Sequence, residues 1–196
     1  MQLAVGKKYY DRPKYKTLRD LIQDCAVRYG DNDAYRYHET PGGPEIIRSF
    51  RQFAEDIDVC GTALMNMGLS GKHVVIVGAN CYEWAIAHNA VVNGTGVSVP
   101  LDRQLPEQEV INLCRRGQAD AVIYGADHHH IALSVAADNR NIHHFICMKP
   151  GIISRELIAS DPRFVSWDQI MERGRRLLQN GDRRFLDAEI DPEAMC

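Results

Sequence analysis

The chain has 196 residues, of which 45% are hydrophobic and 25% charged, and this suffices for one packed domain or one large lobe. Its formal net charge of −3 combines both signs, so no basic face suggests nucleic acid as a partner. No apolar run approaches the roughly 20 residues that cross a bilayer, and the N-terminus lacks the apolar core of a signal peptide. We therefore expect a cytoplasmic protein without a transmembrane segment.

The first elements are a helix and a hairpin. Apolar residues recur at helical spacing over 18–29, where Thr17 can cap the start and Gly30 the end. Residues 34–38 and 45–49 flank the turn "ETPGGP", and they are predicted to pair as a β-hairpin at the periphery of the fold.

Two later helices begin with capping boxes, in which a serine precedes a glutamine by three residues. Ser49 and Gln52 start the first of these helices, and Ser166 and Gln169 start the second. Both carry a stripe of residues predicted to face inward. The stripes are Phe50, Phe53, Ala54, Ile57, Gly61 and Leu64, and then Trp167, Ile170, Met171, Leu177 and Leu178.

Between these helices, short strands and helices alternate. The predicted strands are 73–77, 96–99, 121–124, 143–147 and 163–166, and the helices between them are 82–93, 106–116 and 129–139. Pro106 is expected at the first helical position, which suits its fixed φ. Alternation in units this short predicts an α/β fold, a mainly parallel sheet flanked by helices.

Six cysteines are dispersed along the chain, and no two form a C-x-x-C pair. Most lie in apolar segments, which is typical of buried, reduced thiols rather than of disulfides or a zinc site. They are Cys25, Cys60, Cys81, Cys114, Cys147 and Cys196.

Two segments resemble phosphate-binding motifs but lack essential parts. The predicted strand 73–77 is followed by Gly78 alone, whereas a dinucleotide fingerprint needs G-x-G-x-x-G. The stretch "GLSGK" (68–72) leads into a strand, and His73 stands where a Walker loop needs Ser or Thr. We interpret it as a turn.

A histidine run occupies positions 128–130, and His143 and His144 follow further on. Adjacent histidines point in different directions, whereas a helical metal site needs ligands at i and i+4. A loop or a solvated helix start is the favoured interpretation, and no metal site is assigned. The sequence also lacks a G-x-S-x-G elbow, so we assign no catalytic residue.

The stretch "VVNGTGVSVPLD" (91–102) contains two glycines that could either cradle a phosphate or serve the scaffold. Together with "SFRQFAEDI" (49–57) and "GLSGKHVVIVGANCYEW" (68–84), it resembles the N-terminal region of the AMP-forming acyl/aryl-CoA synthetases. The resemblance covers about 17–149. The "PLD" ending followed by "QLPEQEV" is most similar to the long-chain fatty-acid–CoA ligase branch. In this family the segment is scaffold, so Gly94 is expected to end a helix and Gly96 to permit close packing.

The resemblance implies that 1–196 is a single N-terminal lobe of an AMP-binding domain, truncated before the phosphate-binding loop. That loop resembles T-S-G-T-T-G-x-P-K-G, and no such run occurs in the chain. The complete enzyme would use ATP, Mg²⁺ and CoA to activate a carboxylate, in this branch a fatty acid. We expect none of these cofactors to bind to this lobe alone, and we expect the lobe to be inactive.

Two further expectations follow from the resemblance. Asp102 and Arg103 occupy a loop that lies beside the CoA channel in some ligases of the family, so Arg103 is a candidate partner for a CoA phosphate. Alternatively, the loop is solvated and Asp102 only stabilises its turn. Apolar surface that another lobe would cover predicts a homodimer.

Two other functional classes stay open at this point. A scaffold or interaction module with the same fold would have lost the chemistry. An unrelated doubly wound nucleotide binder is disfavoured by the incomplete fingerprints described above.

Overall fold

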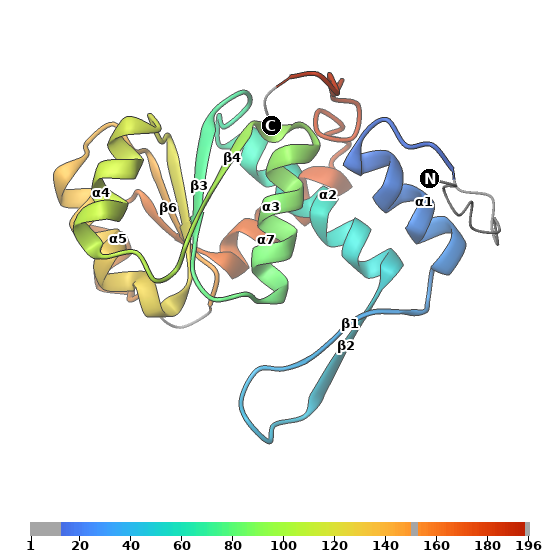
Figure 1. The fold of residues 1–196 in the computed structure, drawn as a ribbon, viewed down its shortest axis with the longest axis horizontal. Coiled ribbons are helices and arrows are strands. Elements are labelled where there is room, and N and C mark those ends of the chain that lie inside the picture. The colour runs from blue at the N-terminus through green and yellow to red at the C-terminus, as the bar shows by residue number, and fades with distance from the viewer. Residues whose placement is uncertain (1–12, 150–152, 195–196) are drawn as a thin grey trace, which may run out of the picture.

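The computed structural model describes residues 13–149 and 153–194, which form a five-stranded sheet, a separate hairpin and seven α-helices (Figure 1). The N-terminal stretch 1–12 and Cys196, which entered the sequence analysis, lie outside this range. Within the described part of the chain, no helix is long and apolar enough to cross a membrane.

The sheet is parallel throughout, and its strands follow the order β4-β3-β5-β6-β7. This confirms the predicted fold class and all five predicted strands, with small shifts at the ends. The strands are β3 (His73–Val77), β4 (Val97–Leu101), β5 (Ala121–Tyr124), β6 (His144–Cys147) and β7 (Phe164–Ser166).

Two helical layers cover the sheet, because alternate strand residues point to opposite faces. On one face lie α2 (Phe50–Asn66), α3 (Tyr82–Ala90) and α7 (Trp167–Gln179), packed on a core that includes Val74 and Ile76. On the other face lie α4 (Glu107–Arg116) and α5 (His129–Asp138), packed on a core that includes Val75 and Val77. The first helix, α1 (Leu18–Tyr29), packs against α2 outside these layers (Figure 1).

The hairpin is peripheral, as predicted, and projects from the body of the fold (Figure 1). It consists of β1 (Asp33–His38) and β2 (Glu45–Ser49), which pair antiparallel. Two tyrosines anchor its base. The Tyr35 ring lies 4.9 Å from that of Phe53, and the Tyr37 ring stacks on Tyr82 at 5.7 Å between centroids.

Both predicted capping boxes are present. Ser49 caps α2 with Gln52, and Ser166 caps α7 with Gln169, each with both reciprocal hydrogen bonds. Most members of the predicted inward stripes are buried, and Leu178 packs against the core, but four members are only partly buried. These residues are Phe50, Ala54, Leu177 and Leu178.

The segment 91–96 confirms the scaffold interpretation of its glycines. The helix predicted over 82–93 is regular only to Ala90, and a wider turn over Val91–Thr95 follows it. Gly94 ends this turn with φ +123°, a value that side chains resist. A Cβ on Gly96 would lie 2.3 Å from the Lys72 carbonyl oxygen, so close packing requires glycine there.

Two details differ from the sequence predictions. Pro106 is the N-cap of α4 rather than its first helical residue, because its ψ of 150° is extended and the helix starts at Glu107. Helix α6 (Arg155–Ser160) was not predicted, since it is a short turn of chain between β6 and β7.

Gly174 lets α2 and α7 cross closely, and Gly61 of α2 leaves room for Phe185, which follows α7 in the chain. A Cβ on Gly174 of α7 would lie 2.0 Å from the Val59 carbonyl oxygen of α2. On α2, a Cβ on Gly61 would lie 2.2 Å from the ring of Phe185. The crossing therefore has no space for a methyl group on α7, and the packing of Phe185 leaves none at Gly61 of α2.

Arg19 of α1 joins three distant parts of the chain. Its guanidinium donates to the backbone oxygens of Phe185 at 2.7 Å, Leu186 at 3.2 Å and Ala188 at 2.8 Å. It also donates to the backbone oxygen of Asn93 in the turn after α3. The contacts hold α1, this turn and the segment after α7 together.

Asp58 of α2 lies beside this cluster, and its environment disfavours the charged form. Burial, which outweighs the attraction of Arg19, raises the pKa of Asp58 from 3.8 to about 6. Because the folded pKa is raised, the stability contribution of this carboxyl is complete below about pH 4. It is lost as the pH rises through about 6.

We expect Asp58→Asn to raise the free energy of unfolding at pH 7.5 by about 1 kcal/mol, a value discounted for partial exposure. At pH 4.5 the gain should shrink, since the wild-type carboxyl is then mostly protonated. Urea unfolding at both pH values measures this difference. Asp31→Asn, at a position whose side chain is 91% exposed, is the control that should show no such gain. A gain that is equal at both pH values would contradict the assignment.

Candidate functional site

The strand order places a reversal between β3 and β5. The chain passes from β3 to β4 on one side of β3 and then returns to β5 on the other side. In open α/β sheets, ligands bind outside the carboxyl ends of the strands at such a reversal. The loops that follow β3 and β5 are therefore the first place to look for a site.

At this reversal, however, two glycines bring the loops into backbone contact. Gly78, with φ +146°, follows β3, and its Cβ would lie 2.7 Å from the Gly125 nitrogen after β5. A Cβ on Gly125 would in turn lie 3.2 Å from the Gly78 Cα. The two loops therefore meet backbone to backbone at the reversal, and the sequence there lacks the complete glycine fingerprint of a phosphate site.

Asp102 and Arg103 lie at the same edge of the sheet, in the loop that follows β4, and both are exposed. The Asp102 carboxylate accepts a hydrogen bond from the Gln104 nitrogen at 2.8 Å, and its backbone oxygen accepts one from Leu105 at 3.2 Å. These bonds stabilise a turn that presents the Arg103 side chain to solvent. The geometry is compatible with a phosphate partner, and it is also what a solvated loop would show.

The histidine run contains one buried member, so the sequence interpretation as a solvated segment is wrong for His128. That residue is 5% exposed, and its Nε2 donates to the Arg103 backbone oxygen at 3.0 Å. His129 lies 3.0 Å from the Tyr124 hydroxyl through its Nδ1, and His130 is exposed. The rings thus point to different places, and no cluster of three potential metal ligands occurs among the described residues.

A cavity of about 220 Å³ opens at the carboxyl edge on the α2, α3 and α7 face, beneath the hairpin. The Tyr82 hydroxyl donates to Asp56 at 3.0 Å, and burial followed by that carboxylate raises the pKa of Tyr82. Beside it, Lys149 and Glu83 form an ion pair at 3.3 Å. Arg48 also lines the cavity, and its buried Nε has no hydrogen-bond partner among the described residues.

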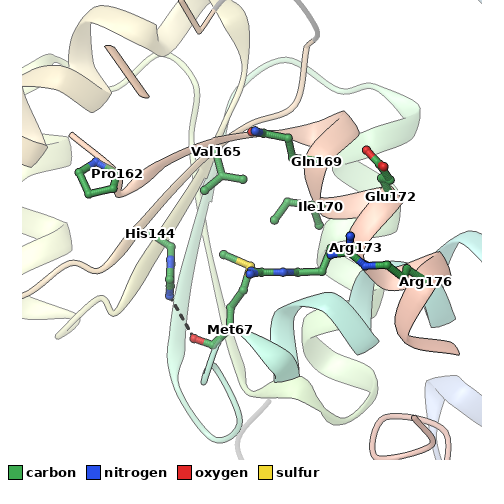
Figure 2. A pocket seen from close by; sticks show the side chains of 9 residues that line it. All are labelled: Met67, His144, Pro162, Val165, Gln169, Ile170, Glu172, Arg173 and Arg176. Carbon is green, nitrogen blue, oxygen red and sulfur yellow. Dashed lines mark hydrogen bonds between the residues drawn. The ribbon is translucent and has the colours of Figure 1, made fainter. Parts of the chain in front are cut away.

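A larger cavity, of about 410 Å³, lies between α7 and the strands β6 and β7 (Figure 2). Its strand wall includes Val165 and His144, the first residue of β6, whose Nε2 donates to the Met67 backbone oxygen at 3.1 Å. Burial lowers the pKa of His144, so the ring is neutral at pH 7. Arg173 and Arg176 line the opposite wall and are exposed. Glu172 also lines the cavity, and among the described residues no hydrogen bond joins it to His144.

The described cysteines match the sequence interpretation as free thiols. Cys60, Cys114 and Cys147 are buried, and burial raises the pKa of Cys114 to about 11. Cys25 and Cys81 are partly exposed, and burial likewise raises the pKa of Cys81 to about 11. The thiols of Cys81 and Cys114 are therefore protonated at neutral pH and are poor nucleophiles.

Sequence reasoning missed the contacts that determine this edge. The bond between His128 and Arg103 joins residues 25 positions apart, and the Gly78–Gly125 contact joins two separate strand ends. A glycine directly after each of two neighbouring parallel strands was the one available signal of close approach.

Comparison with known proteins gives a consistent result. A family model described as AMP-binding enzyme matches residues 22–182. No significant match is found among curated proteins.

Several solved structures share the fold. A putative long-chain-fatty-acid CoA ligase from Rhodopseudomonas palustris superposes with a TM-score of 0.65 at 19% identity, over 79% of this chain and 36% of that one. Coronafacic acid ligase from Pectobacterium brasiliense gives 0.68 at 18%, over 80% and 29%. The A domain of carboxylic acid reductase from Segniliparus rugosus, in complex with AMP and a co-purified carboxylic acid, gives 0.68 at 16%, over 81% and 30%. The chain therefore spans about a third of the length of these proteins.

Proposed function

Because the chain belongs to the AMP-binding enzyme family, we propose that it forms the N-terminal lobe of an adenylate-forming acid–thiol ligase of the fatty-acid–CoA type. The complete enzyme would activate the carboxylate with ATP and Mg²⁺, release pyrophosphate and transfer the acyl group from AMP to CoA. The family match over 22–182 carries the proposal. The choice of fatty acid and CoA is supported by the "PLD" and "QLPEQEV" segments and by the fold likeness to a putative long-chain ligase.

In this proposal the lobe supplies scaffold rather than chemistry. Holding a triphosphate requires several backbone donors and a cation that converge on it. The sequence has no T-S-G-T-T-G-x-P-K-G run, and the loops at the strand reversal meet at Gly78 and Gly125. The phosphate-binding groups would therefore come from another part of the enzyme.

We expect the 196-residue chain to show no exchange of labelled pyrophosphate into ATP above background when a long-chain fatty acid is supplied. Loss of a single charge-stabilising donor commonly costs ~10²-fold in rate, and here the whole set is missing. An enzyme extended through the phosphate-binding loop and the C-terminal domain is the positive control. Exchange by the lobe alone would show that the site is misplaced. If the extended enzyme also shows no pyrophosphate exchange, a non-catalytic scaffold module with the same fold is favoured.

We also propose Asp102 and Arg103 as the part of this lobe that approaches the CoA nucleotide. Asp102 stabilises the turn, and the exposed guanidinium of Arg103 would pair with a phosphate. The support is the loop's place at the carboxyl edge of the sheet, where α/β folds bind their ligands.

We also propose that this chain self-associates through α1. This helix has no fully buried residue, and its apolar side chains are among the most exposed in the described structure. Leu18 is 48% exposed, Val27 83% and Tyr29 48%. We expect light scattering to show a mass that rises with concentration toward a dimer, because apolar patches tend to be covered. Val27→Glu should weaken the association, and a clean monomer at high concentration would contradict it.

A further inference from the structure

Among the described residues, one hydrogen bond joins the loop that carries Arg103 to a distant part of the chain, in addition to the packing of Leu105 against the core. The Asp102 carboxylate and backbone oxygen bond only to Gln104 and Leu105, which are local contacts within the turn. The long-range contact is the hydrogen bond from His128 Nε2 to the Arg103 backbone oxygen at 3.0 Å.

This hydrogen bond crosses the end of a strand. Arg103 follows β4 and His128 follows β5, but β3 lies between those two strands in the sheet. The histidine therefore connects two loops over the carboxyl end of β3, next to the Gly78–Gly125 contact. Since a carbonyl oxygen only accepts, Nε2 must carry the proton.

The imidazole itself is held firmly enough to serve as a support. The residue is 5% exposed, and it ends the short turn Ala126–His128 that leads into α5. Its Nδ1 lies 3.0 Å from the Asp127 carboxylate in a geometry that makes no hydrogen bond. The bond to the Arg103 backbone oxygen is thus the one hydrogen bond that the ring makes among the described residues.

We propose that His128 is a positioning residue that holds the backbone of Arg103. The Arg103 guanidinium is then presented at the carboxyl edge of the sheet to a phosphate group of a nucleotide such as CoA. This inference rests on the proposed CoA contact of Arg103. The physical reason is pre-organisation. A side chain on a fixed backbone loses less conformational freedom when it binds than one on a mobile loop.

The first experiment measures the loop directly in this chain. Amide hydrogen exchange at Gln104 and Leu105 reports opening of the turn, and the amide of Val75 in β3 reports global unfolding. We expect His128→Ala to accelerate exchange of the loop amides about tenfold relative to Val75. His128→Gln, whose amide can donate to the same oxygen, should restore most of the protection.

His130→Ala is the matched control, because it removes an exposed ring from the same histidine run. It should leave exchange in the loop unchanged. The proposal is wrong if His128→Ala accelerates amide exchange equally in the loop and at Val75, or if it accelerates exchange at neither place. In both cases His128 only packs in the core.

The second experiment uses the complete ligase and separates the two proposals. Arg103→Ala should raise the KM for CoA about tenfold with little change in kcat. His128→Ala should raise the same KM when Arg103 is present and have no further effect in the Arg103→Ala background. If Arg103→Ala leaves the KM unchanged, the CoA contact is wrong, and the exchange experiment alone decides whether His128 positions the loop.

Discussion

Replacing Gly174 by alanine is expected to lower the free energy of unfolding by about 3 kcal/mol, although Gly→Ala inside a helix ordinarily stabilises by about 1 kcal/mol. The reversal of sign follows from the crossing of α2 and α7. The new Cβ would lie 2.0 Å from the Val59 carbonyl oxygen and 2.8 Å from its carbonyl carbon. Both are backbone atoms, so no side chain can rotate away and the two helices must separate.

Urea unfolding of the variant measures the effect, and Glu172→Ala is a suitable control. Glu172 lies two residues earlier on α7 and is exposed, so its replacement should change stability by less than about 0.5 kcal/mol. A stabilised Gly174→Ala protein would mean that the two helices lie further apart than described here.

Replacing Arg19 by alanine is expected to cost about 3 kcal/mol, because one guanidinium supplies donors to four backbone oxygens. The substitution also removes the positive charge beside the partly buried Asp58. Arg19→Lys should be intermediate, since a single ammonium cannot reproduce the planar fork of donors.

Without Arg19, the segment after α7 loses its hydrogen bonds to α1, and we therefore expect this segment to detach locally. A measurement of overall stability would not show this local change. Arg183 and Arg184 are exposed trypsin sites directly before the clamped residues 185–188. Limited trypsinolysis under native conditions should cut here faster in Arg19→Ala than in the wild type. Equal cleavage rates would show that another contact, such as the buried Phe185, holds the segment.

The sequence predicted the local elements well because their signals are local. Capping boxes at Ser49 and Ser166, the turn glycines and the alternation of apolar runs all act within a few residues. The boundaries shifted where tertiary contacts intervened. Helix α3 gives way to a wider turn after Ala90, and within that turn Gly94 lies against Arg19, whose Nη2 would lie 2.9 Å from a Cβ at that position.

The candidate site was less predictable, since its determinants are distant in sequence. Nothing local distinguishes His128 from His130, although one ring is buried and the other exposed. Similarly, Arg19 looks like an ordinary charge on an amphipathic helix until the oxygens of residues 185–188 come together around it. Motif reasoning recognised the family without revealing these contacts.

The Arg19 contacts also have a consequence for synthesis on the ribosome. Arg19 lies in the first helix, but the last carbonyl oxygen that it binds belongs to a residue 169 positions later. At about 5–20 residues per second, roughly ten to thirty seconds separate the translation of these two partners. During that interval α1 emerges without its final anchor, and its apolar side chains are available to chaperones. The order of translation thus delays the anchoring of this helix until residues 185–188 have been made.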